Sequence, residues 1–492
     1  MLFISFINNI FAAKTTMKVN ESLRLSLLLQ EMLRSDLSHS FSKNIPVSLI
    51  EEKSSSVNPE SRACVFTPVN TVLTMLLAAI QEDKSLQNGL NLFRTVFESD
   101  CAFLMQVEAN RIAAEKMNDS RGPAKAGRPR QYKSRLPKRY QSPLSDSTAG
   151  YSIARKNLDI NIVKDVYMHS TDFGDLDRER WHGMKTFIGD GTCLQLQDTA
   201  DIKSQYQVKG QEDSFPQALL QVLIGQGTGQ ISQYAPGSRS VSELCLVIPM
   251  INNLEENSLL LAGDLYNTYY HFCLVLARKC HIIVPGKRDR NYTVIREISG
   301  NDRIVEIHKT ARPDYVSKEE WNSLPKTIIL RRITYTYPTK NGEETAVLYT
   351  TIVDDTIKTH EIVTKYTMRR DIEISIRKIK TVMDINVLRS KSRDMMLKEL
   401  IIALTACNLL RKIIAESADP VGFSPRKIAF KNSLRLIALF FWIREGAFFT
   451  GGLRVDMDML MHKISKQKIP HRKGKRRHYP RKTKKGKYQK YK

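Results

Sequence analysis

The first part of the chain has the three-to-four spacing of apolar residues that is typical of helices. The clearest case is 69–80, which Thr67 and Pro68 precede as a helix start. A stretch rich in proline, glycine and positive charge then spans 120–146 and predicts a linker. We therefore expect an all-α N-terminal domain over 1–119, joined by a basic linker to the rest of the chain.

From Met184 onward the pattern changes to short apolar runs separated by glycine-containing turns. A group of strands followed by alternating helices and strands is typical of an α/β layout. Two helices are expected, at 243–252, with Ser242 as N-cap, and at 267–279. The expected strands are 185–189, 193–197, 218–224, 229–234, 258–262 and 281–284.

A β-rich segment interrupts this layout. Residues 327–337 and 345–351 alternate polar and apolar positions, and Lys340-Asn341-Gly342 between them predicts a hairpin. A helical pattern resumes at 358–418. The predicted order after the linker is a first catalytic-domain part (147–290), an insertion (291–357), a second catalytic-domain part (358–418), a helical region (419–462) and a basic tail (463–492).

The composition narrows the class of protein. Hydrophobic residues make up 42% of the 492 residues, which excludes wholesale disorder. No apolar run reaches the roughly 18 to 20 residues of a membrane span. Seven scattered cysteines without a Cys-x-x-Cys pair predict reduced thiols in a cytoplasmic protein rather than a zinc site.

The charge points to a polyanion as partner. The formal net charge is +25, and lysine and arginine fill half of positions 463–492, where no residue is acidic. Gly127-Arg128-Pro129-Arg130 matches the core of an AT-hook, whose arginines lie in narrow A·T minor grooves. The alternatives are a solubility tail and a plain basic linker.

Four residues of one predicted helix carry candidate chemistry. Tyr366, Arg369, Glu373 and Lys380 fall within an arc of about 60° at about 100° per residue. Arg370 and Arg377 add positive charge beside that row. An apolar stripe for packing on a sheet runs along its edge: Met368, Ile372, Ile376, Ile379 and Met383. The alternative is an ordinary amphipathic helix with an Arg369–Glu373 ion pair.

Two further acids favour the functional interpretation. Asp190 and Asp264 each stand where a predicted strand ends. Carboxylates at strand ends, with a third on a helix across the sheet edge, can converge, and clustered anions are stable when a divalent cation neutralises them. Oxygen ligands select Mg²⁺ or Mn²⁺. Two such ions would suit in-line phosphoryl displacement at Asp190, Asp264 and Glu373 without a protein nucleophile.

These residues resemble a known family. Tyr366-x2-Arg369-x3-Glu373-x6-Lys380 fits the Y-(2)-R-(3)-E-(6)-K signature of the insertion-sequence-four family of DDE transposases. Asp190-Gly-Thr192 looks like the family's first-aspartate motif, and Leu261-Ala-Gly-Asp264 with Tyr269 looks like its second. The likeness runs from roughly residue 60 to the end of the chain and includes Arg477-His-Tyr-Pro-Arg481.

The resemblance implies a ribonuclease-H-like mixed sheet with helices on both faces, and Asp190, Asp264 and Glu373 as catalytic ligands of two Mg²⁺ or Mn²⁺ ions. Tyr366, Arg369 and Lys380 would contact transposon-end phosphates. Trp321 would stack a displaced base if cleavage proceeds through a hairpin, the alternative being simple packing. Two residues depart from the family pattern: Tyr266, where a small residue is usual, and Arg370, where tryptophan is common.

The predicted function is cut-and-paste transposition of an insertion sequence in a bacterium, with transposon ends and target DNA as partners. A homodimer is expected from the need to join two ends, and no membrane partner is expected. A non-catalytic DNA-binding protein and a nuclease of the same fold that cuts without joining are the alternatives.

Overall fold

The structure is a computed structural model that describes residues 45–57, 65–91, 93–94, 108–113, 115–116, 147–208, 214–286, 290–339, 342–438 and 462–467. Arg128 and Arg130 of the AT-hook match, the turn residues Lys340 and Asn341, and most of the basic tail lie outside the described residues. The predicted domain boundaries stay predictions.

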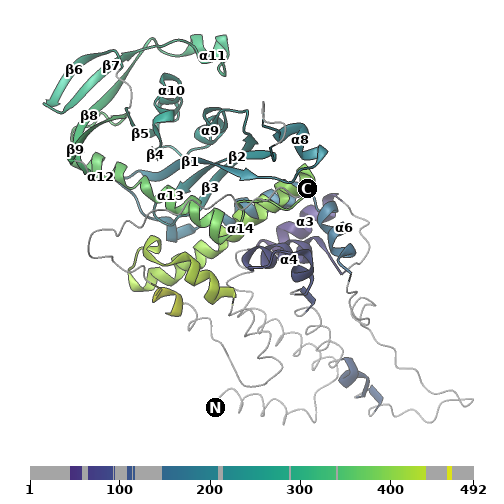
Figure 1. Cartoon of the computed structure of the whole chain (residues 1–492). Helices are drawn as coiled ribbons and strands as arrows, with labels where there is room; N and C mark the ends of the chain where they lie inside the picture. Colours follow the sequence, from purple (N-terminus) through teal and green to yellow (C-terminus); the bar gives the residue numbers. More distant parts are fainter. Residues whose placement is uncertain are drawn as a thin grey trace, which may run out of the picture.

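A nine-stranded mixed sheet forms the centre of the molecule, in the order β3-β2-β1-β4-β5-β9-β8-β7-β6 (Figure 1). Its first five strands have a ribonuclease-H-like arrangement. β1 pairs with β2 antiparallel and with β4 parallel, and β4 pairs with β5 parallel. These strands are β1 (Lys185–Gln195), β2 (Gln217–Gly225), β3 (Ile231–Ser238), β4 (Ser258–Leu261) and β5 (His281–Pro285).

Successive residues of the central strands enter two separate cores. Phe187 and Leu260 belong to one cluster of buried side chains, while Ile188 and Leu261 belong to the other. Side chains alternate between the two faces of a strand, so a strand covered on both faces is apolar at nearly every position. This explains why 258–262 is a continuous apolar run, and it confirms the predicted α/β fold with helices on both faces.

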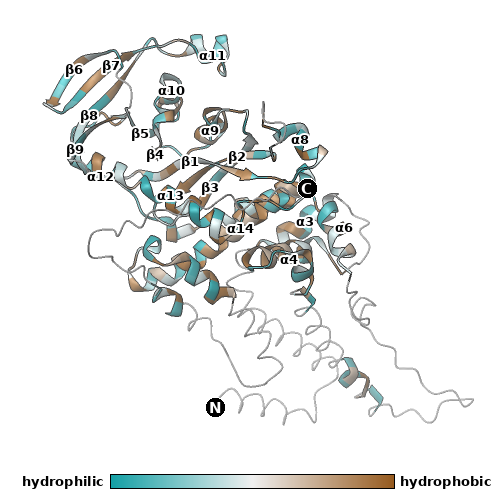
Figure 2. Ribbon diagram, viewed as in Figure 1, coloured by the Kyte–Doolittle hydropathy of each residue, from teal (hydrophilic) through white to brown (hydrophobic). Residues whose placement is uncertain are grey.

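Helices cover each face of this sheet. In Figure 1, α9 (Glu243–Asn252) and α10 (Tyr269–Ala277) lie on one face, and α13 (Arg370–Arg377) and α14 (Arg393–Ala418) lie on the other. Figure 2 shows hydrophobic residues concentrated on the central strands and on α14. Ser242 caps α9 and Thr268 caps α10 through side-chain hydrogen bonds to backbone N–H groups.

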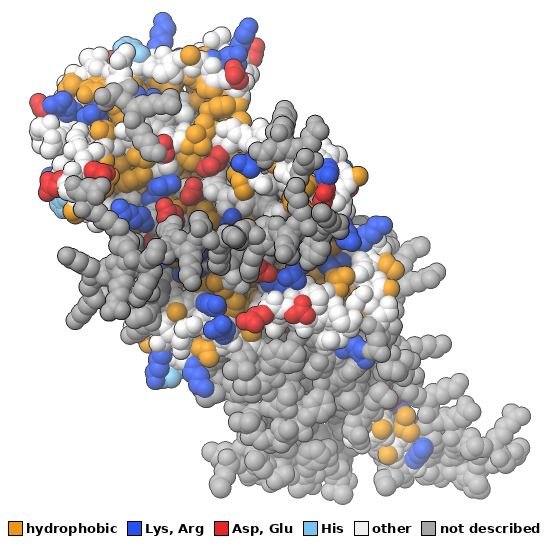
Figure 3. All heavy atoms as spheres, in the orientation of Figure 1, with side chains coloured by type: hydrophobic (Ala, Val, Ile, Leu, Met, Phe, Trp, Pro, Cys, Tyr) orange, Lys and Arg blue, Asp and Glu red, His pale blue; other side chains and the backbone are white. Residues whose placement is uncertain are grey.

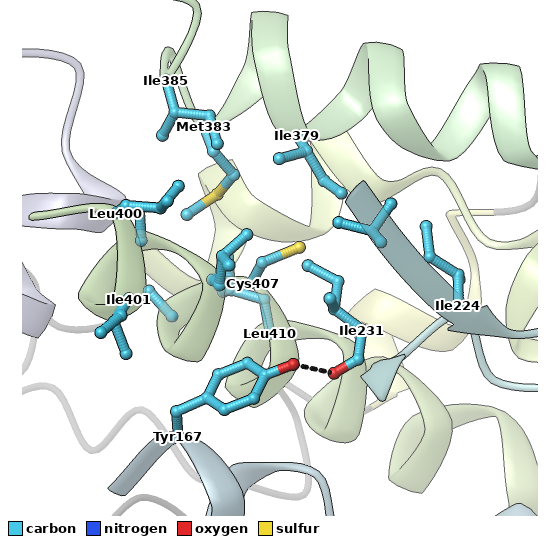
Figure 4. Close-up of a cluster of buried hydrophobic side chains, with 14 of the residues drawn as sticks. Tyr167, Ile224, Ile231, Ile379, Met383, Ile385, Leu400, Ile401, Cys407 and Leu410 are labelled. Atoms are coloured by element: carbon cyan, nitrogen blue, oxygen red, sulfur yellow. Dashed lines mark hydrogen bonds between the residues drawn. The ribbon is translucent and has the colours of Figure 1, made fainter. Parts of the chain in front are cut away.

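The second core joins α14 to segments before the sheet. α7 (Ile160–Ser170) and α4 (Pro68–Ile80) both pack on α14. Figure 4 shows Ile379 and Met383 gathered with Leu400, Cys407 and Leu410, and the Tyr167 hydroxyl donating to the carbonyl of Ile231 at 2.8 Å. The other helices before the sheet are α3 (Val47–Val57) and α6 (Ala149–Asn157), with the 3₁₀ turn η4 (Gly174–Asp177), and α8 (Ala200–Tyr206) follows β1.

The β-rich segment extends the sheet rather than standing apart from it. β9 (Gly342–Thr350) pairs with β5 and with β8 (Thr327–Thr339), as the hairpin pattern predicts. β7 (Asp302–His308) and β6 (Tyr292–Ser299) continue the order, and α11 (Lys318–Ser323) lies between β7 and β8. An ion pair joins β8 to β7: Arg331 Nη2 lies 2.6 Å from Asp302 Oδ2, and both side chains are fully buried.

Two local predictions were wrong. Residues 185–197 form no pair of strands around a turn at Asp190-Gly191, because β1 runs unbroken through both residues with β2 paired alongside. The helix expected over 358–418 is divided into α12 (Thr359–Thr367), α13, the π-helical turn η6 (Lys378–Val382) and α14. Asp384, with φ of 50°, lies in the break before α14.

Helix α14 ends at Ala418, the predicted end of the helical pattern. Two 3₁₀ turns follow it, η7 (Asp419–Val421) and η8 (Pro425–Lys427). Within the described part of the chain, no helix combines the length and apolar character that crossing a bilayer requires. Five cysteines in the same part are free thiols: Cys193, Cys245, Cys273, Cys280 and Cys407.

Candidate active site

Asp190 lies within β1 and Asp264 lies just after β4, the parallel neighbour of β1. Ile188 of β1 pairs with Leu261, the last residue of β4, so both aspartates come two or three residues beyond the same paired position. Asp264 begins the 3₁₀ turn η5 (Asp264–Tyr266), and β1 continues past the end of β4 to Gln195. Asp190 therefore lies where β1 has lost its β4 neighbour, and α13 packs against β1 there.

Arg369 enters the space beside Asp190. Its Nη2 lies 3.9 Å from Asp190 Oδ2, and both side chains are about a quarter exposed, at 25% and 27%. A Cβ on Gly263 would lie 3.0 Å from the same Nη2, so a glycine just before Asp264 leaves room for the guanidinium. Among the described residues Arg369 Nε is buried without a hydrogen-bond partner. The guanidinium thus reaches both strand ends.

The Y-R-E-K row does not lie on one straight helix. Tyr366 belongs to α12, Arg369 to the tight turn after it, Glu373 to α13, and Lys380 to the π-helical turn. The Asp371 and Ile372 amides bond to the carbonyls three residues earlier, which tightens this turn. The calculated common arc was therefore wrong, although the apolar stripe is buried at Ile372, Ile379 and Met383.

The side chains of Tyr366 and Lys380 form hydrogen bonds with the backbone beside β4 and β1. The Tyr366 hydroxyl donates to the carbonyl of Ala262 at 3.5 Å, and burial raises the pKa of Tyr366 to about 12. Lys380 Nζ donates to the carbonyl of Cys193 at 3.0 Å. Both groups therefore border the ends of β4 and β1, and Lys380 would have to exchange its bond to reach a phosphate.

The carboxylates differ in their surroundings. Burial raises the pKa of Asp190; the Arg369 charge opposes this shift, and the Glu373 charge adds to it. Asp264 and Glu373 are exposed. No group of three His, Cys, Asp or Glu side chains among the described residues is placed to hold a metal ion. The acids border one end of the sheet without forming a closed ligand shell, while their oxygen donors suit Mg²⁺ or Mn²⁺.

Glu243 is an acid that sequence reasoning missed. It is the first residue of α9, and its Oε1 accepts a hydrogen bond from the Tyr266 hydroxyl at 2.8 Å. Burial raises the pKa of Glu243, the Tyr266 bond opposes the shift, and the charge of Asp190 adds to it. An acid in the first turn of a helix is so common that its position gave no signal.

A cleft of about 710 Å³ opens beside Asp264 and runs toward the β6–β9 segment. Arg290 and Lys309 are among its lining residues. Trp321, the predicted stacking residue, is 8% exposed, packs edge-on to Tyr269 and lies under Lys309 Nζ at 5.2 Å. In this conformation the indole contributes to the core, and stacking on a base stays a prediction.

The remaining predicted DNA contacts are solvent-facing. Arg370 and Arg377 are exposed on α13. Figure 3 shows acidic and basic side chains interspersed over the middle of the face viewed, rather than one continuous positive surface of described residues. Exposed arginines beside a carboxylate cluster suit phosphate contact, but their roles stay predictions.

One known protein family matches the part of the chain that holds these residues. Residues 181–409 match the family described as Transposase DDE domain. The matched stretch contains Asp190, Asp264, Glu373 and the rest of the Y-R-E-K row.

No curated protein matches the chain. Among solved structures, this chain is similar to the piggyBac transposase in a synaptic complex with hairpin DNA, at 11% sequence identity and a TM-score of 0.38. That similarity covers 88% of this chain and 83% of the other.

Proposed function

We propose that this chain is a DNA transposase that binds terminal inverted repeats and catalyses metal-dependent strand cleavage and strand transfer. The observation that carries the proposal is the placement of Asp190 within β1 and of Asp264 just after the adjacent parallel strand β4, with Arg369 beside Asp190, inside the stretch that matches the transposase DDE domain. The insertion-sequence-four assignment rests on the Y-R-E-K spacing and is part of this proposal.

Divalent cations fit the chemistry of these donors. Asp190, Asp264 and Glu373 offer carboxylate oxygens, and burial together with a neighbouring anion disfavours an unneutralised charge on Asp190. Bound there, two Mg²⁺ or Mn²⁺ ions would supply Lewis-acid stabilisation of the attacking and leaving oxygens of a phosphodiester. The three side chains would need to draw together from their present positions, and both Asp264 and Glu373 are exposed.

The cations beside these acids would hold the DNA. Arg369 is about a quarter exposed and its Nε is unpaired among the described residues, so it can turn from Asp190 toward a phosphate once metal neutralises that carboxylate. Arg370 and Arg377 extend the positive charge along α13. Tyr366 and Lys380 would position the terminal nucleotides, and two transposon ends held together would need a dimer.

The test is incubation of the full chain with labelled DNA that carries the inverted repeats, in Mn²⁺. Nicked, hairpinned and joined products are scored on denaturing gels. Joined products that disappear in Asp190→Asn, with end binding retained, would support the proposal. Nicks without joined products would indicate a nuclease of the same fold, and DNA binding without any cleavage would indicate a non-catalytic DNA-binding protein.

A further inference from the structure

Two arginines, Arg331 and Arg411, are among the largest fully buried side chains of the described residues, and their surroundings differ. Arg331 donates to the Asp302 carboxylate and to two backbone carbonyls. Arg411, in α14, has no hydrogen-bond partner for its Nε and Nη1 atoms among the described residues. A guanidinium keeps its charge at neutral pH, so burying these donors without a partner costs free energy that a bound anion would offset.

A second guanidinium lies beside that of Arg411, against the turn between β2 and β3. Gly229 of this turn has a φ of 80°. A Cβ on Gly229 would lie 3.4 Å from Arg411 Cζ and would clash with Nη1 of Arg426, a residue of η8. Both guanidinium groups therefore approach the same glycine, and the absence of a side chain there leaves room for them.

Lys378 of the π-helical turn η6 is a third cation of this cluster. Burial lowers the pKa of Lys378 to about 7; the charges of Arg411 and Arg426 add to this shift, and Asp371 and Cys407 oppose it. Burial and the Arg426 charge lower the pKa of Arg411 to about 10, and Cys407 opposes the shift. The three cations are thus close enough to repel one another, and an anion among them would relieve that repulsion.

The nearby acids lie beside Arg426 rather than Arg411. Asp371 Oδ2 lies 3.8 Å from Arg426 Nη2, and the Asp371 side chain is 39% exposed. Glu179 contacts the same turn, since a Cβ on Gly227 would lie 2.9 Å from Glu179 Oε2. Burial lowers the pKa of Arg426, and the charges of both acids oppose that shift. Among the described residues no carboxylate charge is found to shift the pKa of Arg411.

Both guanidinium groups are held in place by other contacts. Arg411 Cζ lies 4.6 Å from the ring centroid of Phe430, which is 1% exposed. An aromatic ring attracts the face of a guanidinium and leaves the donors at its edge for other partners. Arg426 donates from Nη1 to the Ser375 hydroxyl at 2.9 Å and from Nη2 to the Asp371 carbonyl at 3.2 Å. The donors of the cluster are therefore positioned before any ligand binds.

We infer that Arg411, Arg426 and Lys378 form a binding site for a compact tetrahedral oxyanion of the sulfate or phosphate type. Such an ion carries several acceptor oxygens and can bond to more than one of these donors at once. Lys378 and Arg426 are half-buried and connect the cluster to solvent. A DNA phosphodiester carries a sugar on either side, for which the buried Arg411 leaves no surface. This inference does not depend on the proposed function.

The test is calorimetric titration of the full-length protein with sodium sulfate at constant ionic strength, repeated with inorganic phosphate. Arg411→Met keeps an apolar stem beside Phe430 and removes the unpartnered donors. We expect it to weaken sulfate affinity on the order of 10-fold or more, and Lys378→Gln to weaken it less. Arg296→Met is the control, because Arg296 is exposed and paired with Asp355. Its affinity should equal that of wild type.

Thermal unfolding gives a second measurement. Without sulfate, Arg411→Met should be at least as stable as wild type, because it removes a buried charge that has no partner. Added sulfate should raise the Tm of wild type in a saturable manner. The variant should keep only the gradual rise that sulfate causes because it is excluded from protein surfaces.

Three outcomes would overturn the inference. The first is equal sulfate affinity in wild type and Arg411→Met, and the second is a saturable rise in Tm in both. The third is displacement of bound sulfate by short duplex DNA, which would make the cluster a contact for DNA phosphates. If Arg411→Met does not fold, the same comparisons between wild type and Lys378→Gln decide.

Discussion

Two arginine–aspartate pairs of this protein differ in distance, burial and hydrogen bonding. Arg331 and Asp302 are 1% and 0% exposed, lie 2.6 Å apart, and are completed by the carbonyls of Asp354 and Ile357 and by the Thr359 hydroxyl. Arg369 and Asp190 lie 3.9 Å apart, are about a quarter exposed, and leave Arg369 Nε unpaired among the described residues.

Under the proposed function, the first pair is structural and the second belongs to the site. The Arg331 pair satisfies its donors and joins β7, β8 and the start of α12, so no other ligand could improve on it. The Arg369 pair is loose, and each partner can exchange the other for something better, Asp190 for a metal ion and Arg369 for a phosphate. The proposed site therefore contains a pair whose hydrogen-bonding capacity is incompletely used among the described residues.

The largest expected effect is on catalysis at the loose pair. Asp190→Asn should lower the rate of strand cleavage by roughly 10³-fold or more, because several kcal/mol of metal-dependent transition-state stabilisation would be lost. The measurement is a single-turnover cleavage rate in Mn²⁺ at saturating end DNA. A variant that cleaves within about tenfold of wild type would show that Asp190 holds no essential ion.

The tight pair should matter instead for stability. Asp302→Ala leaves the Arg331 guanidinium buried without its acid and should lower the free energy of unfolding by about 3 to 5 kcal/mol. Denaturant titration followed by circular dichroism measures it. The matched control is Asp355→Ala, which breaks the exposed pair with Arg296 and should cost at most about 1 kcal/mol. Similar losses in both variants would refute the contrast.

The free energy of unfolding should also depend on pH, through the buried His271. Burial lowers the pKa of His271 to about 4, below its usual 6.5. Because its folded-state pKa is depressed, His271 stabilises the fold above pH 6.5, and this stability is lost as the pH falls toward 4. We expect roughly 2 to 3 kcal/mol over that window. Unfolding of wild type and His271→Gln at several pH values measures it, and identical slopes would contradict the assignment.

The smallest effect on stability is expected at Arg369. Arg369→Ala should change the free energy of unfolding by about 1 kcal/mol or less, because the pair is long and partly solvated. The same variant should weaken binding of end DNA and reduce the slope of log affinity against log salt by about one, as for one lost phosphate contact. Unchanged salt dependence would remove Arg369 from the DNA interface.

Much of the fold could be predicted, because strands buried on both faces appear in the sequence as apolar runs and helix starts appear as N-cap residues. The apolar runs at 218–224 and 258–262 became β2 and β4, and Ser242 capped α9 as expected. The parallel pairing of β1 with β4 sets Asp190 and Asp264 two and three residues beyond the same paired position, whereas the predicted strand end at Asp190 was wrong.

The break within 358–418 could not be predicted, since no glycine or proline marks it. Arg369 keeps helical backbone angles, and its side chain lies beside Asp190 and Gly263, which are far from it in the sequence. The place of Glu243 was equally hidden, because a first-turn acid is ordinary and only the tertiary contact with Tyr266 distinguishes it. Contacts between residues far apart in sequence decide such details, and local propensity does not encode them.

The most direct test of the account is anomalous diffraction from crystals of the protein bound to end DNA and grown in Mn²⁺. The account predicts anomalous peaks between Asp190, Asp264 and Glu373 at the end of β1 and β4. Peaks elsewhere in the molecule, with those three side chains still facing solvent around Arg369, would contradict it.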